Sequence, residues 1–442
     1  MPVTNSEEGL KQVIGVPQLS LGIVNGVVGA GIFALPAIVS ISLGAFGIFG
    51  YMFCSIMLAA IMLCYAEIGS KVTTSGGSYA YVEAAFGNFP GYIVNWLYFF
   101  GWSILSSAAL MNIIADSLAV VYPIFTNPLV RAVFFFVLVG SIVLVNIRGA
   151  KQGMGMVVIL TVTKLIPLFA IIIFGFSYVK GENLHWENVP SLKTFGDTML
   201  ILFFAFAGFE SSLGTSGECK NCNRTVPRSI FLGGLISLVL YILLQTVIQG
   251  VLGDQMSKYK DAPLAAVADI IVGPIGATIL LVTAAISCFG TVTADILATP
   301  RSLFAGAKNG IFPKYLGKVH STYSTPHLAV GTYGALIFIF SISGGFKQLA
   351  ILASAAILIV YLAVILATIK MRKIKKDDSE KTFRAPGGLI TPLIGIASII
   401  WLLTGLTKWE ILSTLIFVAI IIVSYFGMNW IKNKSTTVSL QK

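Results

Sequence analysis

The first long apolar stretch of this 442-residue chain is unusually rich in glycine. Four glycines fall between Gly22 and Gly31, although the stretch has the length and apolarity of a bilayer-spanning helix. Glycine costs roughly 1 kcal/mol relative to alanine inside a helix, so we expect the backbone to leave helical geometry near Gly29–Gly31. Unwound backbone at membrane depth persists only where it lines a cavity. The pattern predicts a carrier whose exposed amide and carbonyl groups bind a small zwitterion or ion.

The composition predicts an all-α polytopic membrane protein. Hydrophobic residues make up 56% of the chain and charged residues 11%, and the mean hydropathy is +0.90, which excludes an ordinary soluble enzyme. Windows of about 20 apolar residues predict twelve transmembrane helices. They lie near 16–40, 43–69, 91–121, 132–147, 154–178, 195–217, 229–252, 268–300, 326–344, 348–369, 388–406 and 410–431. Residues 1–15 lack a basic leader region and are expected to form a cytoplasmic tail.

The net charge of +11 is interpreted as a topology signal. Twenty-one of the 29 lysines and arginines fall on one side of the predicted spans if both termini share that side. By the positive-inside rule this side is cytoplasmic, so no nucleic-acid partner is expected. The predicted external set is Arg131, Lys180, Lys193, Lys258, Lys260, Lys347 and Lys408.

The sixth predicted span repeats the peculiarity of the first. Gly208, Glu210 and the serines that follow interrupt its apolar run. Spans one and six hold corresponding positions in two five-span halves, 16–178 and 195–369, as expected of an inverted-repeat transporter with a midplane site. A basic linker (370–387), two further helices (388–431) and a cytoplasmic tail (432–442) complete the chain. The alternative is close helix packing, since Gly22 and Gly26 form a GxxxG pair.

Several motifs carry a resemblance to a known family over nearly the whole chain. They are GAGIFALP at 29–36, YAE at 65–67, GGSY at 76–79, FFAFAGFE at 203–210, ExKNxxRxxP at 218–227, Arg301 to Pro313 after the eighth span, and FRAPGG at 383–388. In this order they resemble the motifs of the amino acid, polyamine and organocation (APC) transporter superfamily. Two departures, Cys222 in place of a usual proline and residues 73–75 without one, lie in predicted cytoplasmic loops.

The resemblance implies a leucine-transporter-type fold, with broken helices 1 and 6 and an alternating-access cycle. It implies a substrate site formed by Val27, Gly29, Ala30, Gly31, Tyr98, Gly101, Ser106, Phe204, Ala207, Gly208 and Asp295. Amides near Ala30 and Gly31 would bind a carboxylate, helped by a helix dipole. Carbonyls near Val27, Phe204 and Ala207 would bind an ammonium group. Phe204 matches a gating aromatic, and Tyr98, Gly101 and Ser106 match side-chain subsites. Bundle packing is the alternative for Phe204 and Tyr98.

Lys164 lies about 15 Å along the fifth predicted span, near the middle of a roughly 30 Å hydrocarbon layer. A charged lysine there costs at least about 2.5–3.5 kcal/mol, so we expect it to face a wet cavity, pair with a carbonyl or an acid, or lose its proton. Snorkelling to the interface is the alternative. In some relatives a lysine at the matching place occupies the site where sodium-driven members bind sodium. The resemblance implies that Lys164 replaces that ion and couples transport to protons.

Two acids complete the predicted site. Asp295 lies where relatives line the distal substrate pocket, and an acid there suits arginine, lysine, ornithine or a polyamine; a pair with Lys164 or a helix-end carboxylate are the alternatives. Glu210 matches a recurrent family acid and is interpreted as gating or helix-orienting, with a structural hydrogen bond as the alternative. Asp116 is expected near the outer surface.

The sequence therefore predicts a secondary active transporter of amino acids in the cell membrane, coupled to protons without sodium. An exchanger favouring cationic amino acids or polyamines is an alternative, as is a nutrient sensor with the same fold. The expected partners are the substrate, protons and the lipid bilayer. No catalytic residue, cofactor or metal site is expected, because the three histidines lie outside the span interiors and the Cys219/Cys222 pair lacks two further ligands.

Overall fold

The computed structural model describes residues 14–29, 31–73, 76–148, 153–186, 188–308, 312–321, 323, 325–373 and 382–439. Over these ranges the chain is helical, and pairing of extended chain is limited to one bridge between Ile14 and Cys219. The prediction of an all-α protein is confirmed.

The helices fall into two runs along the chain. The first run is α1 (Val16–Val27), α2 (Gly31–Leu43), α3 (Gly47–Lys71), α4 (Ser78–Phe86), α5 (Asn88–Trp96), α6 (Leu105–Val121), α7 (Pro128–Arg148) and α8 (Gly153–Gly175). The second is α9 (Leu192–Phe206), α10 (Cys222–Leu252), α11 (Pro263–Val272), α12 (Pro274–Lys308), α13 (His327–Ser343), α14 (Phe346–Lys373), α15 (Ile390–Thr404) and α16 (Lys408–Ser439). A π-helix, η2 (Leu97–Ile104), joins α5 to α6, and a 3-10 helix, η6 (Phe209–Glu218), follows α9.

Among the described residues, nine helical stretches are long and apolar enough to cross a membrane, with α2 and α3 counted as one stretch. The shorter apolar helices are α1, α11, α13 and α15. The outer surface is also apolar: Leu129 is 73% exposed, Phe136 65% and Ile275 72%. An aqueous protein rarely exposes so much contiguous apolar surface, whereas a bilayer requires it. The chain is a multi-pass membrane protein.

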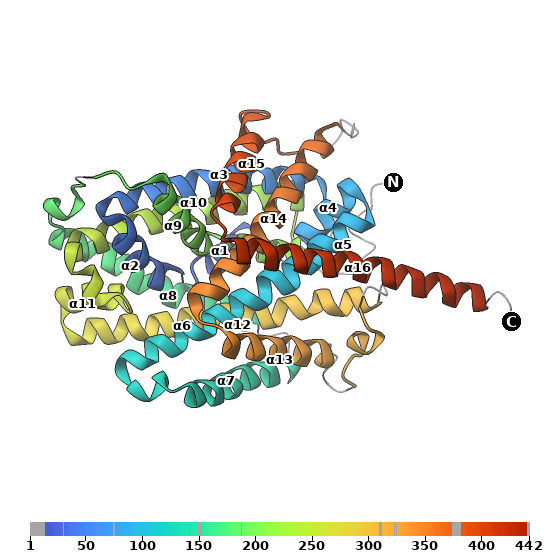
Figure 1. Cartoon of the computed structure of the whole chain (residues 1–442), viewed down its shortest axis with the longest axis horizontal. Coiled ribbons are helices and arrows are strands. Elements are labelled where there is room, and N and C mark those ends of the chain that lie inside the picture. The colour runs from blue at the N-terminus through green and yellow to red at the C-terminus, as the bar shows by residue number, and fades with distance from the viewer. Residues whose placement is uncertain are drawn as a thin grey trace.

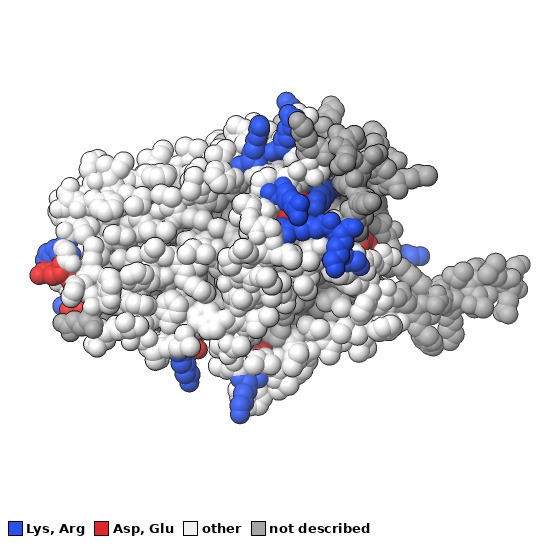
Figure 2. All heavy atoms as spheres, turned by 90° about the horizontal axis from the view of Figure 1, so that it is seen from above, with Lys and Arg blue, Asp and Glu red and all other residues white. Residues whose placement is uncertain are grey.

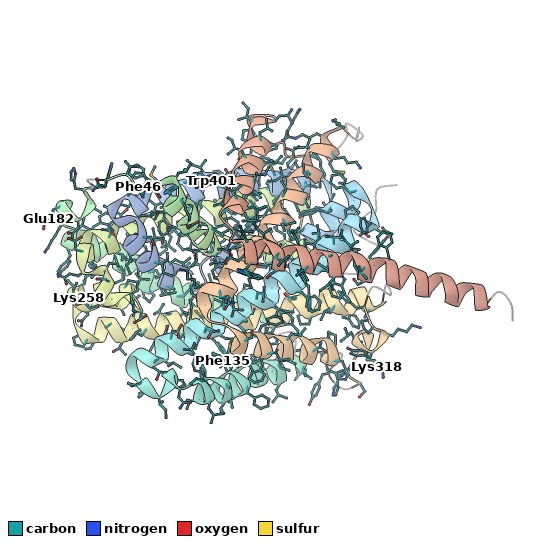
Figure 3. The ribbon with its side chains drawn as sticks, viewed as in Figure 1. Phe46, Phe135, Glu182, Lys258, Lys318 and Trp401 are labelled. Atoms are coloured by element: carbon teal, nitrogen blue, oxygen red, sulfur yellow. The ribbon has the colours of Figure 1, made fainter. Side chains whose placement is uncertain are left out.

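Figure 1 places both ends of the chain at one end of the bundle, here called the termini end, with α16 extending beyond the body. The pair α3 and α10 packs along one edge and the pair α7 and α13 along the opposite edge. Most Lys and Arg side chains on the face seen in Figure 2 gather toward the termini end. Lys318 lies at that end, while Lys258 and Glu182 lie at the other, in agreement with the predicted division of basic residues (Figure 3).

The interrupted helices lie at the centre of the bundle. α1 packs against α8, α10 and η6, and α2 packs against α9. One predicted boundary is wrong: the span expected at 268–300 begins later, because Gly273, with a φ of 81°, separates α11 from α12. Pro274 then starts α12, the position in a helix where proline is most favourable.

Candidate functional site

The first helix break lies where the glycine pattern predicts it. α1 ends at Val27 and α2 begins at Gly31, and between them the Gly29 amide donates to the Val27 carbonyl at 2.8 Å. The first amides of α2 have no acceptor within their own helix, and the helix dipole adds positive charge there. This end of α2 is suited to bind a carboxylate. Ala30 lies outside the described residues.

The second break follows α9, which ends at Phe206. Ala207 is extended, with a ψ of 162°, and Gly208 has a φ of 113°, a conformation that L side chains rarely adopt. The chain then continues as the 3-10 helix η6 and does not resume α-helical geometry until α10. A helix end of this kind leaves its last carbonyl groups without partners in the helix.

The two breaks touch through their glycines. A β-carbon on Gly26 would lie 2.4 Å from the Gly208 carbonyl oxygen, and one on Gly208 would lie 2.5 Å from the Gly26 oxygen. A β-carbon on Gly31 would lie 2.5 Å from the Cα of Ala205, and Gly22 likewise faces η6. Only glycine permits these approaches. Close packing, the alternative proposed for Gly22 and Gly26, is thus part of the same arrangement.

Tyr241 of α10 links the two breaks. Its hydroxyl lies 2.8 Å from the Val27 carbonyl oxygen and 2.7 Å from the Ala205 carbonyl oxygen. One hydroxyl proton is shared between a carbonyl of each broken helix. Nothing in the local sequence around Tyr241 indicates this contact.

Lys164 of α8 is buried against the first break, where its side chain is 1% exposed. Its Nζ donates to the carbonyl oxygens of Val28 at 2.5 Å and Asn25 at 3.2 Å. The hydroxyl of Ser287 on α12 lies 3.2 Å from both the Val28 and the Gly29 carbonyl oxygens. An ammonium group therefore sits among backbone carbonyls, one of the arrangements expected for a lysine at this depth.

Glu210 of η6 contacts the second break. Its Oε2 accepts a hydrogen bond from the Gly208 amide at 3.1 Å and from the Tyr361 hydroxyl of α14 at 2.5 Å. Glu210 is 2% exposed. The geometry matches a carboxylate that fixes the unwound segment against α14.

A cavity of about 150 Å³ lies between the breaks. Nine of the predicted substrate residues line it: Val27, Gly29, Gly31, Tyr98, Ser106, Phe204, Ala207, Gly208 and Asp295. Residues not predicted also line it: Ile14, Gln18, Leu19, Gly22, Asn25, Gly26, Trp102, Ser107, Leu110, Ser211, Ser212, Thr291, Ala294 and Ala298. The lining combines free helix ends with hydroxyl side chains, as in a site for a small polar molecule.

Phe204 forms one wall of this cavity. Its ring centroid lies 5.8 Å from that of Trp102 and 5.6 Å from that of Phe346, the latter edge to face. The lining also includes Ile14 and Gln18 beside the start of α1. The cavity thus reaches toward the start of α1. The rings of Trp102, Phe204 and Phe346 close it near the start of α14.

Asp295 of α12 is held by hydroxyl groups. Ser103 donates to its Oδ1 at 2.8 Å and Thr299 to the same oxygen at 2.7 Å. Ser107 donates to its Oδ2 at 2.6 Å, and the Tyr333 hydroxyl of α13 donates to that oxygen too. Both carboxylate oxygens are occupied by partners from α12, α13 and the η2–α6 segment, and the partner is not Lys164.

The π-helix η2 changes which side chains face the cavity. A π-helical turn adds a residue and shifts the faces that follow it. Gly101, expected at a subsite, instead faces α14, where a β-carbon on it would lie 2.6 Å from the Cβ of Ala356. The prediction for Gly101 is corrected accordingly. Ser107, six residues further along, lines the cavity beside the predicted Ser106.

Two of the sequence motifs meet away from the cavity. Glu67 of the YAE motif is fully buried and binds Arg372 at 2.5 Å and Lys71 at 3.2 Å. It also accepts from the Ala385 amide of the FRAPGG segment at 3.0 Å. Arg372 in turn donates to the Gly388 carbonyl at 2.7 Å. These motifs fasten α3 to the ends of α14 and of the basic linker.

The remaining predictions concern polar residues outside the cavity. Asp116, at 48% side-chain exposure, forms an ion pair with Arg131 at 2.6 Å. The Cys222 thiol donates to the Cys219 carbonyl at 2.9 Å. Within the described ranges, no cluster of three or more His, Cys, Asp or Glu side chains could hold a metal ion.

The model of the family described as amino acid permease matches residues 14–437. This chain belongs to the amino acid permease family. The permease is 26% identical over 399 residues to the serine/threonine exchanger SteT of Bacillus subtilis (strain 168), covering 88% of this chain and 90% of the relative. It is 27% identical over 432 residues to the branched-chain amino acid permease BcaP of Lactococcus lactis subsp. cremoris (strain MG1363), covering 92% of each.

A third relative, BcaP of Bacillus subtilis (strain 168), is 24% identical over 440 residues, covering 96% of the permease and 94% of the relative. These relatives are transporters and not enzymes. The resemblance to APC transporters is confirmed, and the substrate class at family level is amino acids.

Proposed function

We propose that this permease is a secondary active transporter of small neutral amino acids that works by alternating access and couples to protons without sodium. The observation that carries the proposal is the convergence of two helix breaks on one cavity lined by Gly31, Phe204 and Gly208. Unpaired backbone groups of both signs at one cavity match the two charged ends of an amino acid.

The proposed fold has twelve transmembrane helices in two inverted repeats of five, followed by two more. In this scheme α1 with α2 and α9 with η6 are the broken first and sixth spans, and α5 with η2 and α6 forms the third. The repeats are 16–178 and 195–369, with the linker at 370–387 and the last pair at 388–431. The convergence of the two breaks supports this arrangement.

Both termini are proposed to be cytoplasmic in a cell membrane, with tails at 1–15 and 432–442. The gathering of basic side chains at the termini end (Figure 2) supports this orientation. The cavity then faces the cytoplasm, because it reaches Gln18 near the start of α1. Phe204 with Trp102 and Phe346 is proposed as the closed external gate.

The substrate carboxylate is proposed to bind the amides at the start of α2, namely Gly31 with Gly29 and Ala30. The ammonium group is proposed to bind carbonyls at the end of α9, namely those of Phe204 and Ala207. The Val27 carbonyl contributes less, because it already accepts from Gly29 and Tyr241 and a carbonyl has two lone pairs.

The proposed side-chain pocket is small and rich in hydroxyl groups, formed by Tyr98, Ser106, Ser107 and Thr291. Asp295 offers little to a cationic substrate, because its two oxygens already accept four hydroxyl donors. A cation-selective exchanger is therefore less well supported than a transporter of neutral amino acids. The serine/threonine exchanger among the relatives agrees with a small polar substrate.

Lys164 is proposed as the coupling group. Protonated, its Nζ supplies the charge that holds the Val28 and Asn25 carbonyls at the first break. Loss of that proton weakens both hydrogen bonds and frees α1 to move relative to α8. Glu210, tied to Gly208 and Tyr361, is proposed to transmit the same movement to η6.

The proposal is tested with the purified permease in proteoliposomes. Radiolabelled serine, threonine, alanine, leucine, lysine and putrescine would be offered with and without an inward pH gradient and with and without sodium. We expect gradient-driven accumulation of a small neutral amino acid without sodium. Counterflow without accumulation would identify an exchanger, and binding without either would identify a sensor.

A further inference from the structure

A second, larger cavity of about 700 Å³ lies on the outside of the bundle between α1, α3 and α10. Its walls come from one face of each long helix: Ala59, Leu63 and Ala66 on α3, and Leu235 and Leu238 on α10. Ala59 and Ala66 carry only a methyl group, and Gly234 accommodates the Met62 side chain, which a β-carbon there would meet at 2.9 Å. The cavity is thus a groove in the membrane-facing surface that is separate from the substrate site.

The groove is open to the side and almost wholly apolar. Phe231 and Leu235 on its rim are 63% and 49% exposed. From Arg228 to Leu238 it follows α10 for ten residues, about 15 Å at 1.5 Å per residue. This length equals half of a roughly 30 Å hydrocarbon layer, the depth of a single lipid leaflet.

One end of the groove is basic. Arg228 is exposed and lines the groove at its termini end, and Arg224, also exposed, lies one turn earlier on the same face of α10. Phe383 of the FRAPGG segment lines the same end, and the exposed Arg384 follows it. Positive charge at the mouth of a leaflet-deep apolar groove complements an anionic headgroup with its acyl chain.

We propose that this groove binds an anionic phospholipid, with an acyl chain between α3 and α10 and the phosphate group on Arg228. The bound lipid would contact a moving part of the permease, because Val16 at the start of α1 forms one wall. The Ser229 hydroxyl lies 3.2 Å from the Val16 carbonyl oxygen and so ties this wall to α10. Occupancy would stabilise the present position of α1.

The test is native mass spectrometry of the full chain, purified with palmitoyl-oleoyl phosphatidylglycerol or phosphatidylcholine. Wild-type protein is expected to retain the anionic lipid about fivefold more than the zwitterionic one. Arg228→Gln is expected to erase this preference, and Ala59→Trp, which fills the groove, to lower retention of both lipids. Lys318→Gln and Ile236→Trp, on residues outside the groove, are the matched controls and should behave as wild type.

Equal retention of both lipids by the wild type would overturn the proposal. So would an Arg228→Gln variant indistinguishable from Lys318→Gln, or displacement of the lipid by excess inorganic phosphate, which would mean that the acyl chain contributes nothing. The comparison of wild type with Arg228→Gln does not depend on whether Ala59→Trp folds. Arg228 is exposed, so its neutralisation leaves the core unchanged. Thermal unfolding of each variant in detergent serves as the folding control.

Discussion

Lys164 is buried against the first helix break and Asp295 is a partly buried residue of the cavity lining, and the two ionisable groups are held in different ways. Lys164 donates to carbonyl oxygens of the unwound segment between α1 and α2. Asp295 accepts from four hydroxyl side chains of α6, α12, α13 and η2. A charge held by irregular backbone is sensitive to the position of that backbone, whereas one held by a closed set of side chains is fixed. We therefore expect the contacts of Lys164 to change when α1 moves and those of Asp295 to persist.

The largest effect is expected from Lys164→Met, which keeps the length of the side chain and removes its charge. The carbonyls of Asn25 and Val28 lose donors worth about 1.5–3 kcal/mol each for charged hydrogen bonds. We expect sodium-free, pH-driven accumulation of substrate to fall at least about tenfold. Lys318→Met is the control, and accumulation equal to wild type in Lys164→Met would remove Lys164 from the coupling mechanism.

Ser287→Ala tests whether the second donor to the Val28 carbonyl also contributes to transport. Its hydroxyl is the other donor to the Val28 carbonyl, so its loss costs about 1 kcal/mol, roughly a fivefold change. We expect pH-driven accumulation to fall by about that factor, measured as initial rate. Thr278→Ala, which removes a hydroxyl bonded only to its own helix α12, is the matched control. A Ser287→Ala variant no different from that control would argue against a shared carbonyl site.

Asp295→Asn addresses the other side of the comparison. An amide retains one acceptor and can donate to hydroxyl oxygens, so we expect a loss of about 1–2 kcal/mol in stability and little change in transport. The unfolding temperature in detergent should drop by a few degrees, and the ratio of lysine uptake to serine uptake should stay unchanged. A change in that ratio would instead support direct contact of Asp295 with a cationic substrate.

Asp116→Asn gives the baseline for an exposed pair, because Arg131 keeps its hydrogen bonds to the buried Asn112 in this variant. The Arg131–Asp116 contact has one partner at 48% exposure, and surface pairs contribute about 0–1 kcal/mol. We expect transport rates within error of wild type and an unfolding temperature within about 2 °C. A larger drop of the unfolding temperature in this variant than in Asp295→Asn would contradict the expected ranking of the two sites.

The sequence predicted the parts of the site that depend on local chemistry. Glycine at 29, 31 and 208 and a lysine at 164 are costly in a transmembrane helix, so each marks an irregularity without knowledge of its neighbours. In the structure the two breaks are in contact, and Lys164 donates to carbonyls of the first. Contacts between distant helices were not predictable: Tyr241 lies 214 residues from Val27 in sequence, and Tyr333 lies 38 from Asp295.

The faces and ends of the helices were also not predictable from the sequence. Gly101 lies in the π-helix Leu97–Ile104 and packs against Ala356, whereas Ser107 lines the cavity beside the predicted Ser106. Apolar composition does not distinguish π from α geometry, so the sequence does not predict these faces. Likewise, apolar residues continue on both sides of the Gly273–Pro274 pair, so hydropathy alone placed the start of the span at 268, before the turn that this pair forms. Hydropathy locates the membrane helices but not their faces or their ends.

The most direct test of the contrast is proton movement in proteoliposomes filled with a pH-sensitive dye. Substrate would be added outside without sodium to wild type, Lys164→Met and Asp295→Asn in parallel. We expect wild type and Asp295→Asn to acidify the lumen on substrate addition and Lys164→Met to leave its pH unchanged. Acidification by Lys164→Met at the wild-type rate, or its absence in Asp295→Asn, would contradict the assignment of coupling to Lys164.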